Sequence, residues 1–258
     1  MTSGAGATTK ETGRAVALAE QVRVGNVRAL SRLMTLLENE HPDGIEGLRL
    51  LSSDARPRIV LGVTGYPGAG KSTLVNALVR AYRRQGMKVA VLAVDVSSAR
   101  TGGALLGDRI RMQEHSLDPD VYIRSMATRG NRGGLARSTD AARQVLEAAG
   151  YDVVLIETVG VGQNESDILT VASTVIAVVA PGLGDEVQAM KAGLLEVAHI
   201  IVVNKFDHPD AERTFRDLRE WCPTVIGTVA TTGDGIAELL TAINEHQHER
   251  TPIRRIES

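Results

Sequence analysis

The alternation of apolar and polar positions divides the chain into short apolar runs and longer amphipathic stretches. Apolar runs rich in β-branched residues, a pattern typical of strands buried on both faces, occur at 59–64, 88–94, 152–156, 174–180, 199–203 and 224–230. Stretches with helical spacing lie between them, at 72–85, 135–149, 185–197, 209–220 and 235–247. Because apolar strands alternate with helices, we predict an α/β fold with a mostly parallel sheet covered by helices on both faces.

The beginning of the chain has a helical pattern of its own. Asn26 is a good N-cap for a helix, and the segment His41-Pro42-Asp43-Gly44 is expected to break that helix before a third short helix at 45–51. We therefore divide the chain into a flexible tail at 1–13, a small N-terminal helical module at 14–55, an α/β domain at 56–248 and a C-terminal tail at 249–258.

The stretch 96–134 departs from the strand–helix alternation. It contains Gly102-Gly103 and Gly133-Gly134 together with many arginines. Long glycine-rich insertions in compact domains are commonly functional or mobile. We interpret 96–134 as a functional insertion and place no strand in it.

The segment from Gly65 to Thr73, GYPGAGKST, follows the first apolar run and opens the first amphipathic stretch. It matches the phosphate-binding loop G-x-x-x-x-G-K-[ST]. Glycines let backbone N–H groups converge on phosphate oxygens, and the helix N-terminus adds a partial positive charge. The residues expected to contact nucleotide phosphates are Gly68, Ala69, Gly70, Lys71, Ser72 and Thr73.

A second motif, Asn204-Lys205-Phe206-Asp207, follows the fifth apolar run. The Asp207 carboxylate can accept hydrogen bonds from the N1–H and the 2-amino group of guanine. Adenine offers neither donor, so the motif predicts guanine recognition. The Lys205 stem can cover the base, and Ala230 or Thr231 can add a backbone contact. The expected base-binding residues are Asn204, Lys205, Asp207 and Ala230.

Carboxylates at two strand ends predict a Mg²⁺ site beside the phosphates. Glu157 and Asp95 each end an apolar run, and Asp108 lies in the insertion. Such oxygen ligands suit Mg²⁺, although Asp95 could instead cap a turn and Asp108 could be a surface charge. The expected metal ligands are Ser72, Asp95, Asp108 and Glu157, and the expected catalytic residues are Lys71, Asp108 and Glu157.

The residues after Glu157 bear on the rate of hydrolysis. Gly160 can bring a backbone N–H to the γ-phosphate. Val161 follows it, where Ras-like GTPases place a water-orienting Gln. We therefore predict slow hydrolysis unless a partner completes the site.

Composition restricts the function classes. The formal net charge is -2, without runs of like charge, so neither nucleic acid nor a membrane surface is an expected partner. The lone Cys222, the absence of a signal-like N-terminus and the absence of an apolar run near membrane length predict a cytoplasmic protein. His246 and His248 lie two apart on the last predicted helix and are expected to be solvated.

Four stretches together resemble the methylmalonyl-CoA mutase-associated GTPases of the MeaB/ArgK type, which are SIMIBI-class P-loop proteins. They are 65–73, 95–112, 157–165 (ETVGVGQNE) and 204–207. A further stretch, 181–188, resembles the family's third switch. The family commonly forms a dimer through a C-terminal helical arm. This chain stops at Ser258, before the usual arm, so the resemblance leaves undecided whether it forms a homodimer.

The resemblance implies a function. It implies a GTP/GDP-binding and GTP-hydrolysing chaperone, with Mg²⁺, that gates cofactor loading or protection of an adenosylcobalamin-dependent acyl-CoA mutase. Two alternatives stay open at this point: a P-loop small-molecule kinase, and a nucleotide-dependent binding module with negligible turnover.

Overall fold

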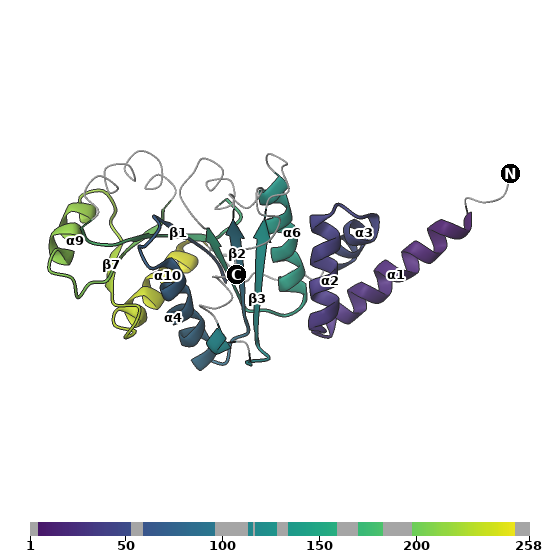
Figure 1. The fold of residues 1–258 in the computed structure, drawn as a ribbon, viewed down its shortest axis with the longest axis horizontal. Coiled ribbons are helices and arrows are strands. Elements are labelled where there is room, and N and C mark those ends of the chain that lie inside the picture. Colours follow the sequence, from purple (N-terminus) through teal and green to yellow (C-terminus); the bar gives the residue numbers. More distant parts are fainter. Residues whose placement is uncertain are drawn as a thin grey trace, which may run out of the picture.

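A computed structural model describes residues 5–52, 59–95, 113–115, 117–127, 134–158, 170–182 and 198–250. Within these residues seven strands form one sheet in which every pair of neighbours is parallel (Figure 1). The strands are β1 (Ile59–Gly65), β2 (Val89–Asp95), β3 (Val121–Ala127), β4 (Val153–Thr158), β5 (Thr174–Val179), β6 (Ile200–Asn204) and β7 (Val225–Thr228). Their order across the sheet is β3-β2-β4-β1-β5-β6-β7, which places β1 at the centre.

Helices cover both faces of the sheet, because alternate side chains of each strand point to opposite faces. On one face Leu61 and Val63 of β1 pack in a cluster with α4 (Lys71–Arg84) and α10 (Ile236–Arg250). On the other face Val60 packs in a cluster with α6 (Gly134–Ala148), while α9 (Ala211–Arg219) packs with β5 and β6. The predicted α/β class is confirmed, and the helix predicted at 185–197 lies outside the described residues.

Three helices precede the sheet: α1 (Ala5–Arg23), α2 (Val27–Glu38) and α3 (Pro42–Leu51). The cap at Asn26 is confirmed, because its side chain accepts hydrogen bonds from the N–H groups of Arg28 and Ala29. Helix α1 begins at Ala5, inside the predicted tail, so that expectation was wrong. The third helix is present and ends at Leu51 as expected, but it begins at Pro42 and not at Ile45, with His41 as the N-cap and Pro42 in the first turn.

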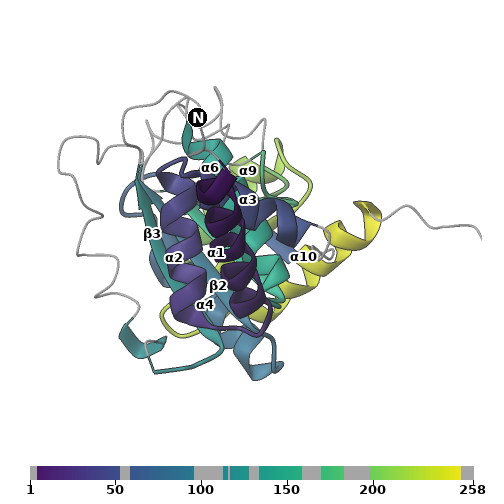
Figure 2. The same ribbon diagram turned by 90° about the vertical axis from the view of Figure 1, so that its right-hand side faces the viewer.

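These three helices pack at one end of the molecule, beyond α6 (Figures 1 and 2). Leu33 and Met34 of α2 belong to the same buried cluster as Leu146 of α6. A charged contact adds to this apolar packing: Arg124 of β3 donates to both carboxylate oxygens of Glu38, at 3.0 and 2.8 Å. The contact ties α2 to the edge strand of the sheet.

Strand β3 lies in the stretch 96–134, where the sequence predicted no strand. It pairs along its whole length with β2, from Val89↔Val121 to Asp95↔Ala127. Two polar residues, Arg124 and Ser125, interrupt its apolar pattern, because an edge strand needs fewer apolar side chains than a central one. The apolar start Val-Tyr-Ile after Asp118-Pro119-Asp120 is the signal that could have identified it.

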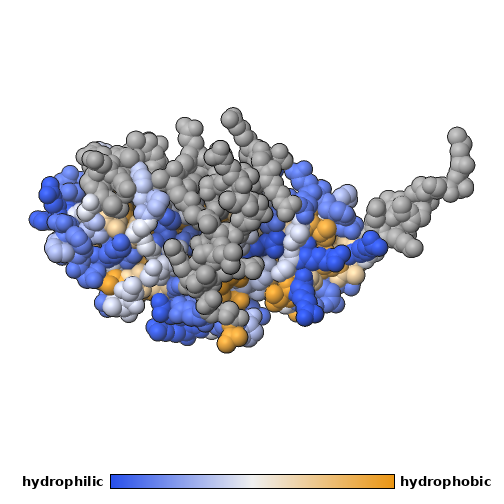
Figure 3. All heavy atoms as spheres, in the orientation of Figure 1, coloured by the Kyte–Doolittle hydropathy of each residue, from blue (hydrophilic) through white to orange (hydrophobic). Residues whose placement is uncertain are grey.

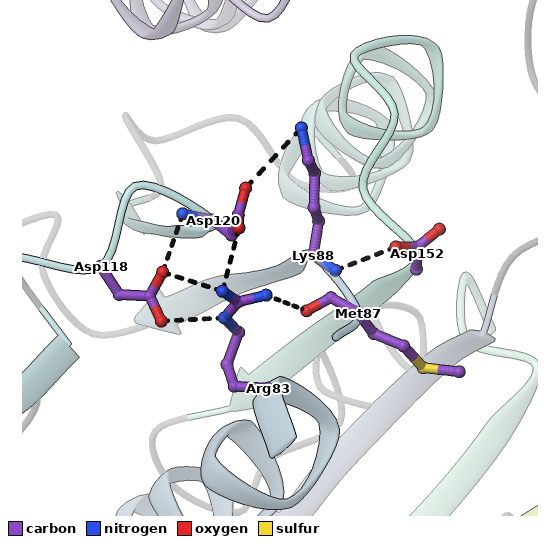
Figure 4. A network of polar contacts seen from close by, with 6 residues as sticks. All are labelled: Arg83, Met87, Lys88, Asp118, Asp120 and Asp152. Carbon is purple, nitrogen blue, oxygen red and sulfur yellow. Dashed lines mark hydrogen bonds and ion pairs between the residues drawn. The ribbon is translucent and has the colours of Figure 1, made fainter. Parts of the chain in front are cut away.

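A network of charged groups joins the N-terminal ends of β2, β3 and β4 (Figure 4). Arg83, in the last turn of α4, donates to both oxygens of Asp118 at 2.8 and 3.1 Å, to Asp120 at 2.9 Å and to the carbonyl of Met87 at 2.7 Å. The neighbouring Lys88 N–H donates to the Asp152 carboxylate at 2.9 Å. Arg83 therefore fixes the end of α4 to the turns before β2 and β3, and Asp152 joins the turn before β4 to the start of β2.

Polar side chains also fix the end of α10 at the start of β5. The Gln247 amide donates to the Thr174 hydroxyl at 2.6 Å, and His246 Nδ1 lies 2.9 Å from the same hydroxyl. The His246 ring packs on that of His199, with centroids 4.3 Å apart. The expectation that both late histidines are solvated was wrong for His246, which is partly buried, whereas His248 is exposed.

The surface around α9 is mostly hydrophilic in Figure 3, and apolar side chains reach the coloured surface in small separate areas. The most exposed large apolar side chains, Leu117, Val24 and Trp221, come from three distant parts of the fold. None of the described helices is both long enough and apolar enough to cross a membrane.

Candidate functional site

The phosphate loop, residues 65–70, joins the C-terminal end of β1 to the first turn of α4. Gly65, Gly68 and Gly70 have φ angles of 141°, 82° and 95°, which side chains other than glycine rarely adopt. Space is a second reason for glycine at two of these positions. A Cβ at Gly65 would lie 2.2 Å from the carbonyl oxygen of Val178, and one at Gly70 would lie 2.2 Å from Asn204 Nδ2. The sequence motif therefore forms the tight turn that its glycines predicted.

Lys71 is the first residue of α4, and its side chain turns back into the loop. Its Nζ donates to the carbonyls of Gly65 at 2.7 Å and of Tyr66 at 3.1 Å, and the residue is only 8% exposed. The ammonium group is therefore held inside the curve of the loop, where it can neutralise the charge of a bound phosphate.

Glu157 lies near the end of β4, opposite Val63 of β1 and Ala93 of β2. Strand β4 therefore pairs directly with the phosphate-loop strand β1. The Ser72 hydroxyl donates to Glu157 Oε1 at 2.6 Å, and Glu157 is 3% exposed. A hydroxyl and a buried carboxylate in contact form a pair of hard oxygen donors, which fits Mg²⁺.

Asn204, the last residue of β6, connects three segments. Its Nδ2 donates to the carbonyl of Ala69 in the phosphate loop at 3.0 Å. Its Oδ1 accepts from the Thr228 hydroxyl at 3.2 Å and from the N–H of Ala230 at 3.1 Å. The side chain is buried, so its bonds hold the phosphate loop, the base loop (residues 204–209) and the loop after β7 (residues 229–235) in a fixed arrangement.

A pocket of about 450 Å³ opens between these segments, within the size range of small-molecule sites. The base loop forms one wall and residues 229–231 form another. Lys205 has a φ of 56°, and both Lys205 and Asp207 are exposed and line the pocket. The residues that line it are Gly70, Thr73, Asn204, Lys205, Asp207, His208, Pro209, Val229, Ala230 and Thr231.

The structure thus brings most of the predicted nucleotide-binding residues together. Ala230 lines the pocket, but its N–H already donates to Asn204. The backbone N–H of Thr231, which also lines the pocket, is therefore the better candidate for a contact with the base. Gly68 lies in a turn where an added Cβ would meet no atom of the described residues within 4 Å.

Several predicted residues lie where the structure gives no description. Asp108 and Gly160, with Val161 and the stretch 183–188, fall outside the described residues. Asp95 ends β2, two positions beyond the partner of Glu157, and its side chain is likewise not described. Their predicted roles stay predictions.

Sequence reasoning missed Thr228, whose hydroxyl donates to the Asn204 side chain. Thr73, which was expected to contact the phosphates, also lines the pocket. Thr228 could have been considered from its place two residues before Ala230, at the end of an apolar run. The bond itself joins residues 24 positions apart and leaves no local pattern.

Comparisons with known proteins agree with this geometry. A protein of Pyrococcus abyssi named as a GTPase is 50% identical over 243 residues, covering 89% of this chain and 75% of that protein. The mouse mitochondrial methylmalonic aciduria type A homolog is 39% identical over 203 residues, covering 73% and 49%. A crystal structure of the LAO/AO transport system kinase superposes with a TM-score of 0.70 at 31% identity, covering 92% and 76%.

The site and the relatives support the same enzymatic activity, the hydrolysis of GTP. The family model described as methylmalonyl-CoA mutase-associated GTPase MeaB matches residues 30–255, which include the phosphate loop, Glu157 and the base loop. The chain belongs to the MeaB family of GTPases.

Proposed function

We propose that this GTPase is a chaperone of an adenosylcobalamin-dependent acyl-CoA mutase of the methylmalonyl-CoA type, and that its nucleotide state gates the loading or protection of the mutase cofactor. The family description names an association with methylmalonyl-CoA mutase. The name of the mouse relative refers to a disorder of methylmalonate metabolism. Both support a partner that handles methylmalonyl-CoA.

The observation that carries the nucleotide part of this proposal is the Asn204 side chain. It bonds the phosphate loop through Ala69 and the loop after β7 through Ala230, and it begins the base loop that carries Asp207. One bound nucleotide can therefore contact all three segments. We infer that guanine occupies the pocket and that its phosphates lie over the phosphate loop.

We propose that Mg²⁺ completes the site through Ser72 and Glu157. Mg²⁺ commonly uses one or two protein groups together with substrate phosphates and water, so this pair of oxygens is a sufficient protein contribution. When bound, the ion would supply positive charge to the phosphates. Lys71, whose Nζ is held by the carbonyl of Gly65, would add a second positive charge.

The position of the site suggests how a partner could act on it. The base loop, the phosphate loop and Glu157 all lie at the C-terminal ends of parallel strands, where ligands bind in sheets of this class. A mutase that orders the segments leaving this edge would change the rate of hydrolysis without entering the nucleotide pocket.

The test is GTP hydrolysis with and without purified methylmalonyl-CoA mutase, measured as the steady-state rate of phosphate release at saturating GTP. We expect the mutase to raise kcat at least tenfold, which needs only ~1.4 kcal/mol of additional transition-state stabilisation. An unrelated acyl-CoA enzyme that does not use cobalamin is the matched control and should have no effect.

Two results would count against the chaperone function. Basal turnover equal to the rate with every cobalamin-dependent acyl-CoA mutase tested would favour an autonomous enzyme. Transfer of the γ-phosphoryl group to a small molecule, seen as a labelled product in place of free phosphate, would favour the kinase alternative.

A further inference from the structure

Phe206, the variable position of the Asn-Lys-Phe-Asp motif, does not line the nucleotide pocket. Its ring lies against the backbone of Gly227 in β7. A Cβ built on Gly227 would be 2.7–2.9 Å from three atoms of that ring. Gly227 does not have a positive φ, so glycine is required there by space and not by backbone conformation.

The ring is held from other directions as well. Phe215 of α9 meets it edge to face, with centroids 5.5 Å apart, and both rings pack against the buried cluster of β5, β6 and α9. The Phe206 N–H donates to the carbonyl of Thr228 at 3.0 Å. The strand cannot easily move away, because a Cβ at Gly235 would already lie 2.0 Å from the carbonyl oxygen of Gly227.

This contact joins the two walls of the pocket. Lys205 and Asp207, on either side of Phe206, line one wall, and residues 229–231, which directly follow β7, line the other. Both Lys205 and Asp207 are exposed, so their own packing fixes them weakly. The distance between the walls therefore depends on how closely the Phe206 ring sits on Gly227.

We propose that Phe206 is a positioning residue for guanine recognition, and that its contact with Gly227 sets the place of the Asp207 carboxylate. The inference rests on the proposed guanine site and adds the element that determines its geometry. Hydrogen-bonded discrimination between bases is sensitive to small displacements, because the site gains only when donor and acceptor meet.

The experiment is calorimetric titration of Gly227→Ala with GDP and with inosine diphosphate, whose base lacks the 2-amino group. The added methyl group should push the ring and with it Asp207. We expect GDP to bind roughly tenfold more weakly and the preference for GDP over inosine diphosphate to shrink. A purely structural role would lower stability but leave that preference unchanged.

Two further variants keep the test decisive. Phe206→Leu in the Gly227→Ala background makes room for the methyl group and should restore most of the preference. Phe206→Ala removes the ring without adding an atom, so it tests the proposal even if Gly227→Ala folds poorly, and it should also reduce the preference. Gly13→Ala is the matched control, because a Cβ there would meet nothing within 4 Å.

The outcomes separate this inference from the proposed base site. If Asp207→Asn weakens the guanine preference but Gly227→Ala and Phe206→Ala retain it, Phe206 has no positioning role. If Asp207→Asn also binds GDP and inosine diphosphate with the original preference, the base site itself is wrong, and the inference fails with it.

Discussion

The two ends of the parallel sheet are built on different principles. At the C-terminal ends, glycines with positive φ and the left-handed Lys205 curve the backbone around a pocket, and polar groups such as Asp207 are exposed. At the N-terminal ends, charged side chains bond to one another and to the turns, as Arg83 does with Asp118 and Asp120 (Figure 4).

At the C-terminal strand ends, polar groups are left exposed around a pocket that can take a ligand. At the N-terminal ends, polar groups bond to one another. Glycine adopts the positive φ angles of the phosphate loop without steric strain, and its lack of a side chain lets Val178 and Asn204 approach the loop closely. The bonds at the opposite end need no ligand to be satisfied. We therefore expect substitutions at the C-terminal ends to change binding and catalysis, and those at the N-terminal ends to change stability.

The largest expected effect is that of Lys71→Ala at the C-terminal end. The transferred phosphoryl group loses its cation, so kcat should fall at least a hundredfold. The carbonyls of Gly65 and Tyr66 lose a donor that water can replace, so the free energy of unfolding should change by less than about 1 kcal/mol. Phosphate release and urea unfolding measure the two quantities.

Lys88→Ala is the matched lysine at the other end of the sheet. Its ammonium is half exposed and lies 3.7 Å from Asp120, so its removal should leave GTP hydrolysis unchanged. Hydrolysis by Lys71→Ala at the normal rate would show that the phosphate loop is not the site of turnover.

Arg83→Ala should lower the stability of the protein and leave its kcat unchanged, which is the reverse of what we expect for Lys71→Ala. It removes bonds to two carboxylates and one carbonyl from a side chain that is 19% exposed, so unfolding should become easier by about 1–2 kcal/mol while kcat stays the same. The shift of the urea midpoint measures this. Arg84→Ala, at the next and exposed position, is the control. A large loss of kcat in Arg83→Ala, without loss of stability, would contradict the division between the two ends.

The sequence predicted the central part of the fold because local pattern and tertiary burial agree there. Strand β1 has apolar side chains on both faces, so the run 59–64 indicated it directly. Strand β3 was not predicted because Arg124 interrupts its apolar pattern. The carboxylate that pairs with this arginine belongs to Glu38, which lies 86 positions away in the sequence. The start of α3 was missed for a similar reason: Pro42 breaks a preceding helix but also suits a first turn.

The same limit applies to the site. The glycines, Lys71 and Asp207 could be proposed for the site because each lies in a motif that is continuous in sequence. The bond from Asn204 to the carbonyl of Ala69 spans 135 positions, and the contact of Phe206 with Gly227 depends on the absence of a side chain in another strand. Motifs predict which groups meet the ligand, but the packing that places them appears only in the folded chain.

The smallest expected effect concerns pH at the N-terminal end of the sheet. His115 lies in a short 3₁₀ helix, Gln113–His115, and its carbonyl accepts from the N–H of Asp118, so it adjoins the Arg83 network. The imidazole is buried, and its Nε2 lies 3.3 Å from the Glu114 carboxylate without forming a hydrogen bond. Burial lowers the pKa of His115. The neighbouring Glu114 carboxylate raises this pKa, but it offsets only part of the effect of burial.

The sign of the effect follows from this lowered pKa. Between the pKa of an unfolded histidine, about 6.5, and the lower pKa in the fold, the unfolded chain binds more protons, so stability falls as the pH drops through this interval. One group contributes at most about 1.4 kcal/mol per pH unit.

His115→Gln should therefore flatten the dependence of the urea midpoint on pH, while GDP affinity at each pH stays as in the unmodified protein. His248→Gln, which removes an exposed imidazole from α10, is the control. An unchanged slope in His115→Gln would show that this histidine does not link protonation to folding, and a changed GDP affinity would show that the two ends of the sheet are coupled.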